Sequence, residues 1–291
     1  MQNRIVKNIK QVTPWWLKIA AKLVIKRIPY PYAWSRKLGL LRHGYMQDIQ
    51  YALDTFHLHY DQAKPRLPDA FTTLELGPGD SLASAVIAAA FGSRRTLLVD
   101  AGSFAATDIQ TYNHFSEQLA KMNLIPAATS YADLADMLRQ TRADYLVKGL
   151  ASLKTLPNDS VDFVFSQAVM EHVHLKDVEE TVRELFRVQP AGGIASHRID
   201  LKDHLASSLH SLRFSKRIWE SQYFRTSDFY TNRLRASEWQ ELFTRSGYRV
   251  LDQININFPA LPLPRSKMQP EFARFSDEDL MVSSVQFVLQ K

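Results

Sequence analysis

The stretch TTLELGPGDSLAS, residues 72–84, passes abruptly from apolar residues into glycine, proline and glycine. Gly77 and Gly79 allow the backbone to approach a ligand closely, and the acid and small residues that follow suit the start of a helix. Asp100 ends the next apolar run, about 20 residues further on, where an acid can accept hydrogen bonds from two ribose hydroxyls. These residue types at this spacing predict a nucleoside site.

Glu75 distinguishes this turn from one that binds a dinucleotide. An acid two residues before the first glycine would repel a pyrophosphate at a helix N-terminus, whereas it tolerates or favours a positively charged ligand. Ser81 also occupies the place of a third glycine, which fits a pyrophosphate badly. The ligand that these residues predict is a nucleoside carrying a cation.

Alternating strand and helix patterns from about residue 71 must position these residues. Apolar runs predict five strands, followed by two more with no helix between them: 71–76, 95–100, 144–151, 161–167, 192–199, 248–255 and 283–291. Helical patterns cover 81–91, 114–123, 130–141, 175–188 and 235–246. The alternation predicts an α/β fold in which helices cover both faces of a parallel sheet, with an antiparallel pair at its edge. Ligands of such sheets bind beyond the carboxyl ends of the strands, where the glycine turn lies.

Composition restricts the chemistry that is available. The 291 residues, 45% of them hydrophobic, suit one large domain with an added segment, or at most two domains. The absence of cysteine excludes disulfides, thiolate metal ligands and a cysteine nucleophile, so any metal must use His, Asp or Glu. No apolar run reaches the roughly 20 residues of a membrane span, and no secretory signal pattern opens the chain. A cytoplasmic protein is therefore expected.

The net charge of +6 comes entirely from the N-terminal segment. Residues 1–47 hold ten Lys or Arg and no acid, which leaves 26 basic and 30 acidic residues in the rest of the chain. Within this segment, Trp15 and Trp16 open a basic amphipathic helix. Such a helix could contact an anionic membrane through residues 1–29, or could pack on the main domain with its lysines in water. No nucleic-acid partner is expected, because no binding motif accompanies the charge.

Five stretches together resemble the class I S-adenosylmethionine-dependent methyltransferases, in that family's order and spacing from about residue 71 to 291. They are LELGPGDS, LLVDAG, LPNDSVDFVFSQAVMEHV, ELFRVQPAGG and GYRVLDQ. The resemblance implies a Rossmann-like, seven-stranded, mostly parallel sheet with helices on both faces and an antiparallel edge strand. It also implies two units: a basic helical extension at 1–65, and a methyltransferase domain at 66–291 with a lid insertion at about 205–234.

The resemblance implies S-adenosylmethionine as the cofactor and assigns residues to its parts. The acid before the turn lies near the methionine amino group, through backbone and water, and the acid after the second strand holds the ribose. The family often has an Asp four residues before the LP pair, which holds the adenine amine; that position is Ser152 here, whose hydroxyl or a nearby backbone group could substitute. The implied cofactor residues are Glu75, Gly77, Gly79, Asp100, Ala101, Ser152 and Gln167.

The acceptor of the methyl group determines what else the protein must supply. Transfer from a sulfonium depends mostly on positioning, but a hydroxyl acceptor benefits from a base or metal that removes its proton, whereas an amine needs only to be bound neutral. MEHV, residues 170–173, and SHRIDLKDH, residues 196–204, follow the fourth and fifth strands and supply candidates. We expect His197 to be the base, and His172 and Asp200 are further catalytic candidates.

A divalent metal is the alternative to a base. Glu171, Asp203 and His204 are candidate ligands, because carboxylates and imidazoles suit such ions. Asp200, Asp203 and His204 would share one face if a helix starts there, although a capped helix start with solvated charges explains the same residues. Ala168 stands where some metal-dependent members of the family carry a glutamate.

Residues 205–234 interrupt the alternation, at a position where insertions commonly cover the acceptor in this family. They are rich in aromatic residues and arginines, which suit either a sugar or phosphate acceptor or a cap with a buried aromatic core. The overall pattern favours O-methylation of a saccharide or small bacterial metabolite. N-methylation, another transfer from the same donor, and a noncatalytic cofactor-binding scaffold or regulator are the alternatives. The oligomeric state stays open.

Overall fold

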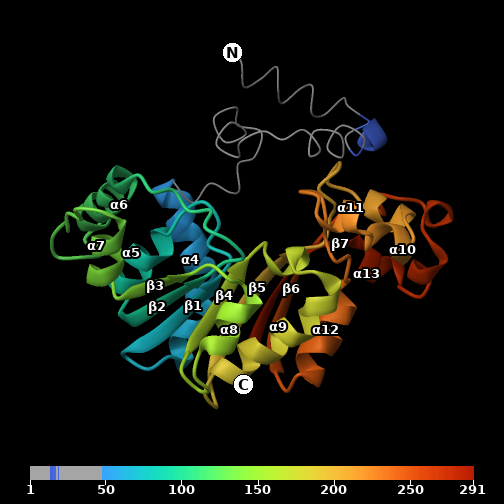
Figure 1. Ribbon diagram of the computed structural model, residues 1–291. Coiled ribbons are helices and arrows are strands. Elements are labelled where there is room, and N and C mark those ends of the chain that lie inside the picture. The colour runs from blue at the N-terminus through green and yellow to red at the C-terminus, as the bar shows by residue number, and fades with distance from the viewer. Residues whose placement is uncertain (1–13, 18, 20–47) are drawn as a thin grey trace.

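A single seven-stranded sheet forms the centre of the computed structural model, which describes residues 14–17, 19 and 48–291 (Figure 1). The strand order is β3-β2-β1-β4-β5-β7-β6. The strands are β1 Phe71–Leu76, β2 Ser93–Val99, β3 Ala143–Leu146, β4 Phe163–Gln167, β5 Ile194–Asp200, β6 Arg249–Asn257 and β7 Val282–Gln290. Strands β1 to β5 are parallel, and β7 pairs antiparallel with both β5 and β6. The predicted antiparallel pair at the edge is confirmed.

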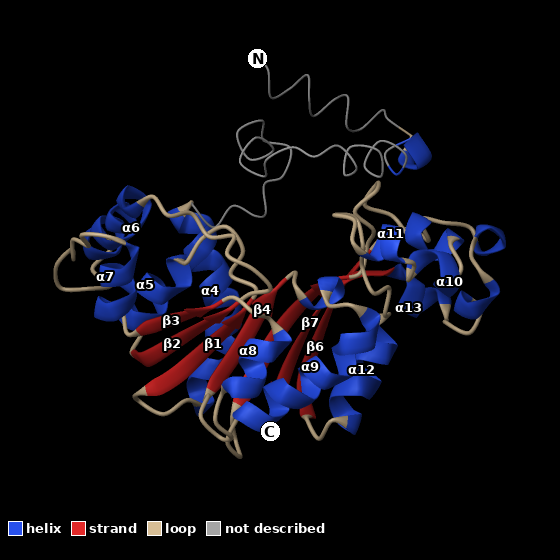
Figure 2. Ribbon diagram, viewed as in Figure 1, coloured by secondary structure: helices blue, strands red, loops and turns tan. Residues whose placement is uncertain are grey.

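Helices cover both faces of the sheet (Figure 2). One face carries α4 Ile49–Ala63, α5 Ala83–Ala90, α6 Ile109–Lys121 and α7 Leu134–Gln140, whose apolar side chains form one core with the sheet. The other face carries α8 Leu150–Thr155, α9 Leu175–Val188 and α12 Ala236–Arg245, which form a second core. The Rossmann-like methyltransferase fold implied by the sequence is confirmed. None of the helices in the described residues has the length and apolar character needed to span a bilayer.

Two predicted elements differ from the structure. The third strand was expected at 144–151 but ends at Leu146, because Gly149, with φ of 51°, turns the chain into α8. Helix α4 lies inside the predicted extension at 1–65, yet its Phe56 packs edge-on against Phe163 and Phe165 of β4. The proposed boundary at residue 66 would separate this helix from the sheet that it covers. Most of the expected basic helix lies outside the described residues; of its residues that the structure describes, 15–17 and 19 are helical.

The insertion after β5 folds as a small cap beside the carboxyl ends of the strands. It contains α10 Lys216–Trp219 and α11 Gln222–Arg225, and it lies beside residues 258–281, which include α13 Asp277–Met281 (Figure 1). Trp219, Phe229 and Tyr230 are buried in it. The aromatic residues of this insertion therefore build its own core, as the second of the two sequence interpretations expects.

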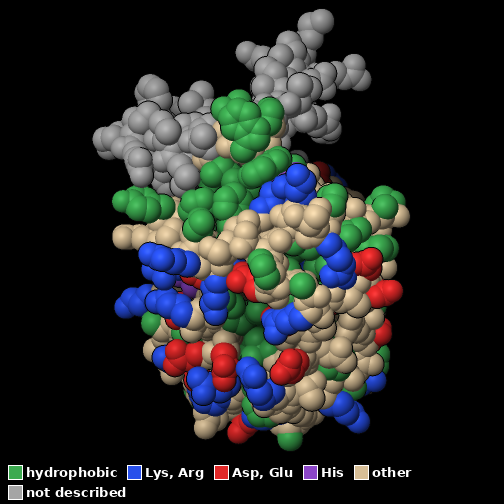
Figure 3. Space-filling view, turned by 90° about the vertical axis from the view of Figure 1, so that its right-hand side faces the viewer, with side chains coloured by type: hydrophobic (Ala, Val, Ile, Leu, Met, Phe, Trp, Pro, Cys, Tyr) green, Lys and Arg blue, Asp and Glu red, His purple; other side chains and the backbone are tan. Residues whose placement is uncertain are grey.

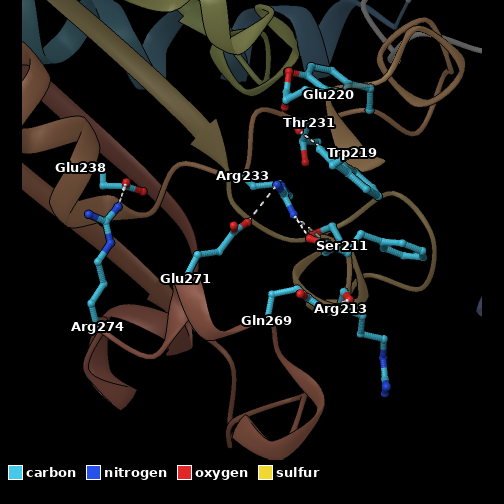
Figure 4. Close-up of polar contacts among 12 residues, drawn as sticks. Ser211, Arg213, Trp219, Glu220, Thr231, Arg233, Glu238, Gln269, Glu271 and Arg274 are labelled. Atoms are coloured by element: carbon cyan, nitrogen blue, oxygen red, sulfur yellow. Dashed lines mark hydrogen bonds and ion pairs between the residues drawn. The ribbon is translucent and has the colours of Figure 1, made fainter. Parts of the chain in front are cut away.

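Arg233 holds the cap together (Figure 4). Its guanidinium donates to the carbonyl oxygens of Ser211 and Phe214 at 3.2 and 2.6 Å, and lies 3.4 Å from the Glu271 carboxylate. The same group stacks 5.3 Å from the ring centre of Trp219. This arginine is used inside the protein and does not serve an acceptor.

Arg235 links the chain segments where the cap meets the sheet. It is fully buried, and its guanidinium donates to the carbonyl oxygens of Leu201, Asp279, Leu280 and Val282. Burial lowers its pKa to about 10, so it stays charged at neutral pH.

Replacing Arg235 with methionine should lower the free energy of unfolding by about 3 kcal/mol, because four buried carbonyl groups lose their donor. For a chain of this size that corresponds to a fall in melting temperature of roughly 5 °C, measurable by calorimetry. Arg245→Met is the control. It is the last residue of α12, whereas Arg235 immediately precedes that helix; its ion pair with Glu179 is exposed, so a change below about 1 kcal/mol is expected. Equal effects of the two substitutions would contradict this role of Arg235.

Candidate active site

The turn after β1 is held against the turn after β4. Gly77 and Gly79 have φ of 75° and 69°, which glycine adopts without strain. The Gly77 amide donates to the Val99 carbonyl at 2.7 Å, and a Cβ on Gly77 would lie 2.5 Å from a methyl group of Val169. Both a positive φ and this close approach therefore require glycine here.

Asp100 is tied to the same turn. Its carboxylate accepts hydrogen bonds from the amides of Gly79 at 2.9 Å and Ala101 at 2.6 Å, and the residue is largely buried. The predicted ribose-binding acid, the glycine turn and the residue after Asp100 thus lie together, as the nucleoside interpretation requires. Their role in holding a cofactor stays a prediction.

Glu75 lies beneath the turn and is 3% exposed. Burial raises the pKa of its carboxyl to about 8, and the nearby Asp100 carboxylate acts in the same direction. Its Oε2 atom makes no hydrogen bond with any described residue. A buried carboxyl that lacks a full set of donors is stabilised by a cationic ligand, so this residue fits a ligand with an ammonium group.

Gln167 is the last residue of β4 and Ser152 lies in α8, and the side chains of both are already engaged. The Gln167 Oε1 atom lies 3.1 Å from Nε2 of His59 on α4. The Ser152 hydroxyl accepts a hydrogen bond from the Lys148 amide at 3.0 Å. Gly149 lies nearer the ribose acid instead, since its amide donates to the Asp100 carbonyl at 2.7 Å. The sequence analysis missed Gly149 and His59; an isolated glycine between a strand and a helix was the signal for the first.

His197 does not lie where we expected the base. It is fully buried within β5, its Nδ1 atom lies 2.8 Å from the Ser166 hydroxyl, and its ring stacks on Phe243 at 5.7 Å. Burial lowers its pKa to about 3, so the imidazole is neutral. Side chains alternate between the two faces of a strand, and this alternation turns His197 toward the core beneath α12. The residue is therefore absent from the edge where a base was expected. In this position His197 cannot reach an acceptor.

The MEHV turn brings a different set of groups to the edge of the sheet. Glu171, His172 and His204 offer ligand atoms that all lie within 4.8 Å of one another. Glu171 is 1% exposed, and its pKa is raised well above the ordinary range by burial. Val169, which touches Gly77, is only two residues before Glu171. The group is therefore adjacent to the turn that carries the cofactor candidates.

The segment that supplies His204 does not form the helix that we considered. Residues 201–209 are turns and bends, and Asp203 caps them: its carboxylate accepts amide hydrogens from Leu205, Ala206 and Ser208 at 3.0, 2.8 and 3.4 Å, and another from His210. This use of its oxygens argues against Asp203 as a metal ligand. Asp200 ends β5 and pairs with the Lys202 ammonium at 3.1 Å.

Residues 74–196 match a family profile described as "Methyltransferase domain". Over this range the resemblance to the class I S-adenosylmethionine-dependent methyltransferases is confirmed. The matched range runs from β1 into β5 and includes the glycine turn, Asp100 and the MEHV turn. The domain is an enzyme domain, and the methyl donor is its cofactor.

Solved structures resemble the chain only at low identity. A methyltransferase from Methanosarcina mazei is 15% identical, with 78% of this chain and 95% of that chain covered and a TM-score of 0.47. Phosphoethanolamine N-methyltransferase 2 from Haemonchus contortus, in complex with S-adenosyl-L-methionine, is also 15% identical, with 82% and 52% covered and a TM-score of 0.47. No match was found among curated protein sequences.

Binding of S-adenosylmethionine should release close to one proton at pH 6.5. Glu75, with a pKa of about 8, is mostly protonated there without ligand, and a nearby ammonium favours its ionised form. The amino group of the ligand stays protonated at this pH, so it adds nothing. Calorimetry in two buffers of different ionisation enthalpy measures the released proton. Glu75→Gln is the control and should release none; a variant that still releases a full proton would contradict the role of Glu75.

Proposed function

We propose that this domain methylates a hydroxyl group of a saccharide or small metabolite. The observation that carries the proposal is the group formed by Glu171, His172 and His204 next to the glycine turn. A hydroxyl must lose a proton during methylation, whereas a neutral amine needs no activating group. Acid and imidazole side chains at this edge supply that function. An N-methyltransferase would have less use for a buried carboxyl here.

The residues divide into a donor site and an acceptor site. Glu75, the turn at 77–79 and Asp100 would hold the donor, since they combine a close backbone approach with buried acids. S-adenosylmethionine supplies an activated methyl group with a neutral leaving group. The acceptor oxygen forms its new bond to carbon while its proton passes to a basic side chain at this edge, for which His172 of the group and the nearby Asp200 are candidates. Since Val169 joins the two sites, donor and acceptor would be aligned through one short segment.

The surface of the cap supports a saccharide on a lipid carrier. Lys216 and Arg217 are exposed on α10, and Tyr223 on α11 is 64% exposed, so charged and aromatic groups face outward together. Cations of this kind suit phosphate, and an exposed ring suits a sugar face or an interface.

Peripheral contact with an anionic membrane fits the same surface. Trp15 packs against the cap, stacking on His210 at 5.1 Å, while Trp16 and Leu17 remain 57% and 44% exposed. Hydrophobic side chains gather near the top of the face in Figure 3, where the described part of the N-terminal helix meets the cap, and basic side chains lie below them. Exposed tryptophan beside basic residues is typical of an interfacial contact.

Glu171→Gln should lower turnover at least about 100-fold and leave the affinity for S-adenosylmethionine unchanged, because it removes an ionisable group and keeps the shape of the side chain. Incubation with labelled donor and a panel of nucleotide-linked sugars, lipid-linked sugars and phenols, followed by mass spectrometry, measures turnover and the methylated atom. Asp100→Ala serves as the matched variant for the donor site and should lose binding. Label found only on nitrogen would contradict the proposal; tight donor binding with no labelled acceptor would favour the noncatalytic alternative.

Trp16→Ser with Leu17→Ser should reduce flotation with phosphatidylglycerol vesicles at least tenfold. Burial of each side chain is worth about 1.5–3 kcal/mol, and 1.4 kcal/mol is tenfold in affinity. The matched control is Ile254→Ser with Ile256→Ser, which removes side chains 41% and 46% exposed on the edge strand β6. Equal flotation of the wild type and the Trp16→Ser, Leu17→Ser variant would contradict the proposed membrane contact.

A further inference from the structure

We propose that Glu171, His172 and His204 bind a divalent transition-metal ion of the Zn²⁺ type. The three residues come from two separate segments, the turn after β4 and the loop after β5, and their ligand atoms lie within 4.8 Å of one another. Two imidazoles and one carboxylate form a ligand set that such ions prefer, with coordination positions left for an exchangeable ligand.

Glu171 is the first indication that the site holds a cation. The side chain is 1% exposed, and neither carboxylate oxygen has a hydrogen-bond partner of good geometry among the described residues; the backbone amides of Glu171 and Asp200 lie near enough only to offset in part the burial that raises its pKa. An unpaired buried carboxylate is costly, and Asp200 adds a second negative charge nearby, offset only in part by Lys202. A doubly charged cation in contact with this carboxylate would offset the cost.

His172 is oriented as metal-binding histidines are. Its Nδ1 atom lies 3.0 Å from the Tyr230 carbonyl oxygen. A carbonyl can only accept, so Nδ1 carries the hydrogen and the lone pair lies on Nε2. A backbone carbonyl that receives the other ring hydrogen is the usual support of a ligating imidazole. Asn232 fixes the same turn, because its backbone amide donates a hydrogen bond to the Glu171 carbonyl oxygen at 2.7 Å.

His204 completes the set from the loop that Asp203 caps. The amide of Leu205 and that of Ala206 donate to the Asp203 carboxylate, which holds the backbone at His204. The rings of His172 and His204 meet edge to face at 4.8 Å. Ligand atoms of a tetrahedral zinc site lie about 3.4 Å apart, so the two exposed imidazoles need to move toward Glu171 by about an ångström. Rotation of surface side chains allows this.

The role of the ion rests on the proposed function, whereas its binding does not. A bound divalent ion lowers the pKa of a hydroxyl that contacts it. The acceptor oxygen would then be methylated as its proton passes to Asp200, which lies nearby at the end of β5 and is not one of the three ligands. Glu171 and His172 would thus act together through the ion rather than as separate bases.

The test is metal binding by the full chain after removal of ions with a chelator. Titration with Co²⁺, followed by its visible absorption, and competition with Zn²⁺ should give one site per chain. Glu171→Gln and His204→Ala should each weaken binding at least about 100-fold, more than is usual for loss of a supporting contact alone. His114→Ala, which alters an exposed histidine beside Glu117, should leave binding unchanged.

Calorimetric titration with S-adenosylmethionine shows that each variant retains its fold and donor site. Absence of a stoichiometric site in the wild type, or equal affinities in the wild type, Glu171→Gln and His204→Ala, would overturn the proposal. Metal binding that depends on these residues, found without methylation of any hydroxyl, would support the site and contradict the proposed function. Hydroxyl methylation that is unaffected by the chelator would overturn the role given to the ion.

Discussion

The close approach of Gly77 to Val169 is the constraint on which the site depends. A Cβ at residue 77 would lie 2.5 Å from the valine side chain, so the turns after β1 and β4 can meet only because one of them has no side chain. The first turn donates the Gly79 amide to the Asp100 carboxylate, and the second leads directly to Glu171. Packing between two backbone segments thus sets the separation between donor and acceptor groups. Such separations matter in group transfer, because small errors in position reduce rates strongly.

Burial has different consequences for the acids and the histidines near this edge. His59 lies between the Ser196 hydroxyl at 2.8 Å and the Gln167 side chain, and burial lowers its pKa to about 4, so it is a neutral member of the core. Glu75 and Glu171 are as deeply buried, yet Oε2 of Glu75 and both carboxylate oxygens of Glu171 lack a hydrogen-bond partner of good geometry among the described residues. Polar groups in a folded core are normally paired. Unpaired acids at the carboxyl ends of the strands are therefore better explained by ligands than by folding.

Periodicity alone was enough to predict most of the fold. Helix α9 was predicted over its observed range, because its apolar residues repeat at helical spacing. The sequence showed no helical pattern between the last two strands, which indicated the antiparallel pair, although the structure has the short helix α13 there. The site was harder to predict, because the direction of a side chain depends on strand register. His197 and Asp200 lie in the same strand. The His197 side chain is buried in the core, whereas Asp200 is the last residue of the strand. His59 required knowledge of contacts between α4 and the sheet, which one-dimensional spacing does not contain, whereas Gly149 had a local signal as an isolated glycine between a strand and a helix.

Contacts between the cap and the loop after β5 link the outer surface to the site. Trp15 stacks on His210 and lies 5.2 Å from the Arg213 guanidinium. The His210 amide donates to Asp203, whose carboxylate also holds the backbone around His204. A membrane bound to the N-terminal helix would therefore be connected, through these contacts, to the loop after β5 that supplies His204. A continuous series of contacts does not by itself make the membrane a regulator of the site. A surface can change the site only if it binds two arrangements of the cap with different affinity, and the short loop capped by Asp203 is the element whose arrangement would have to differ.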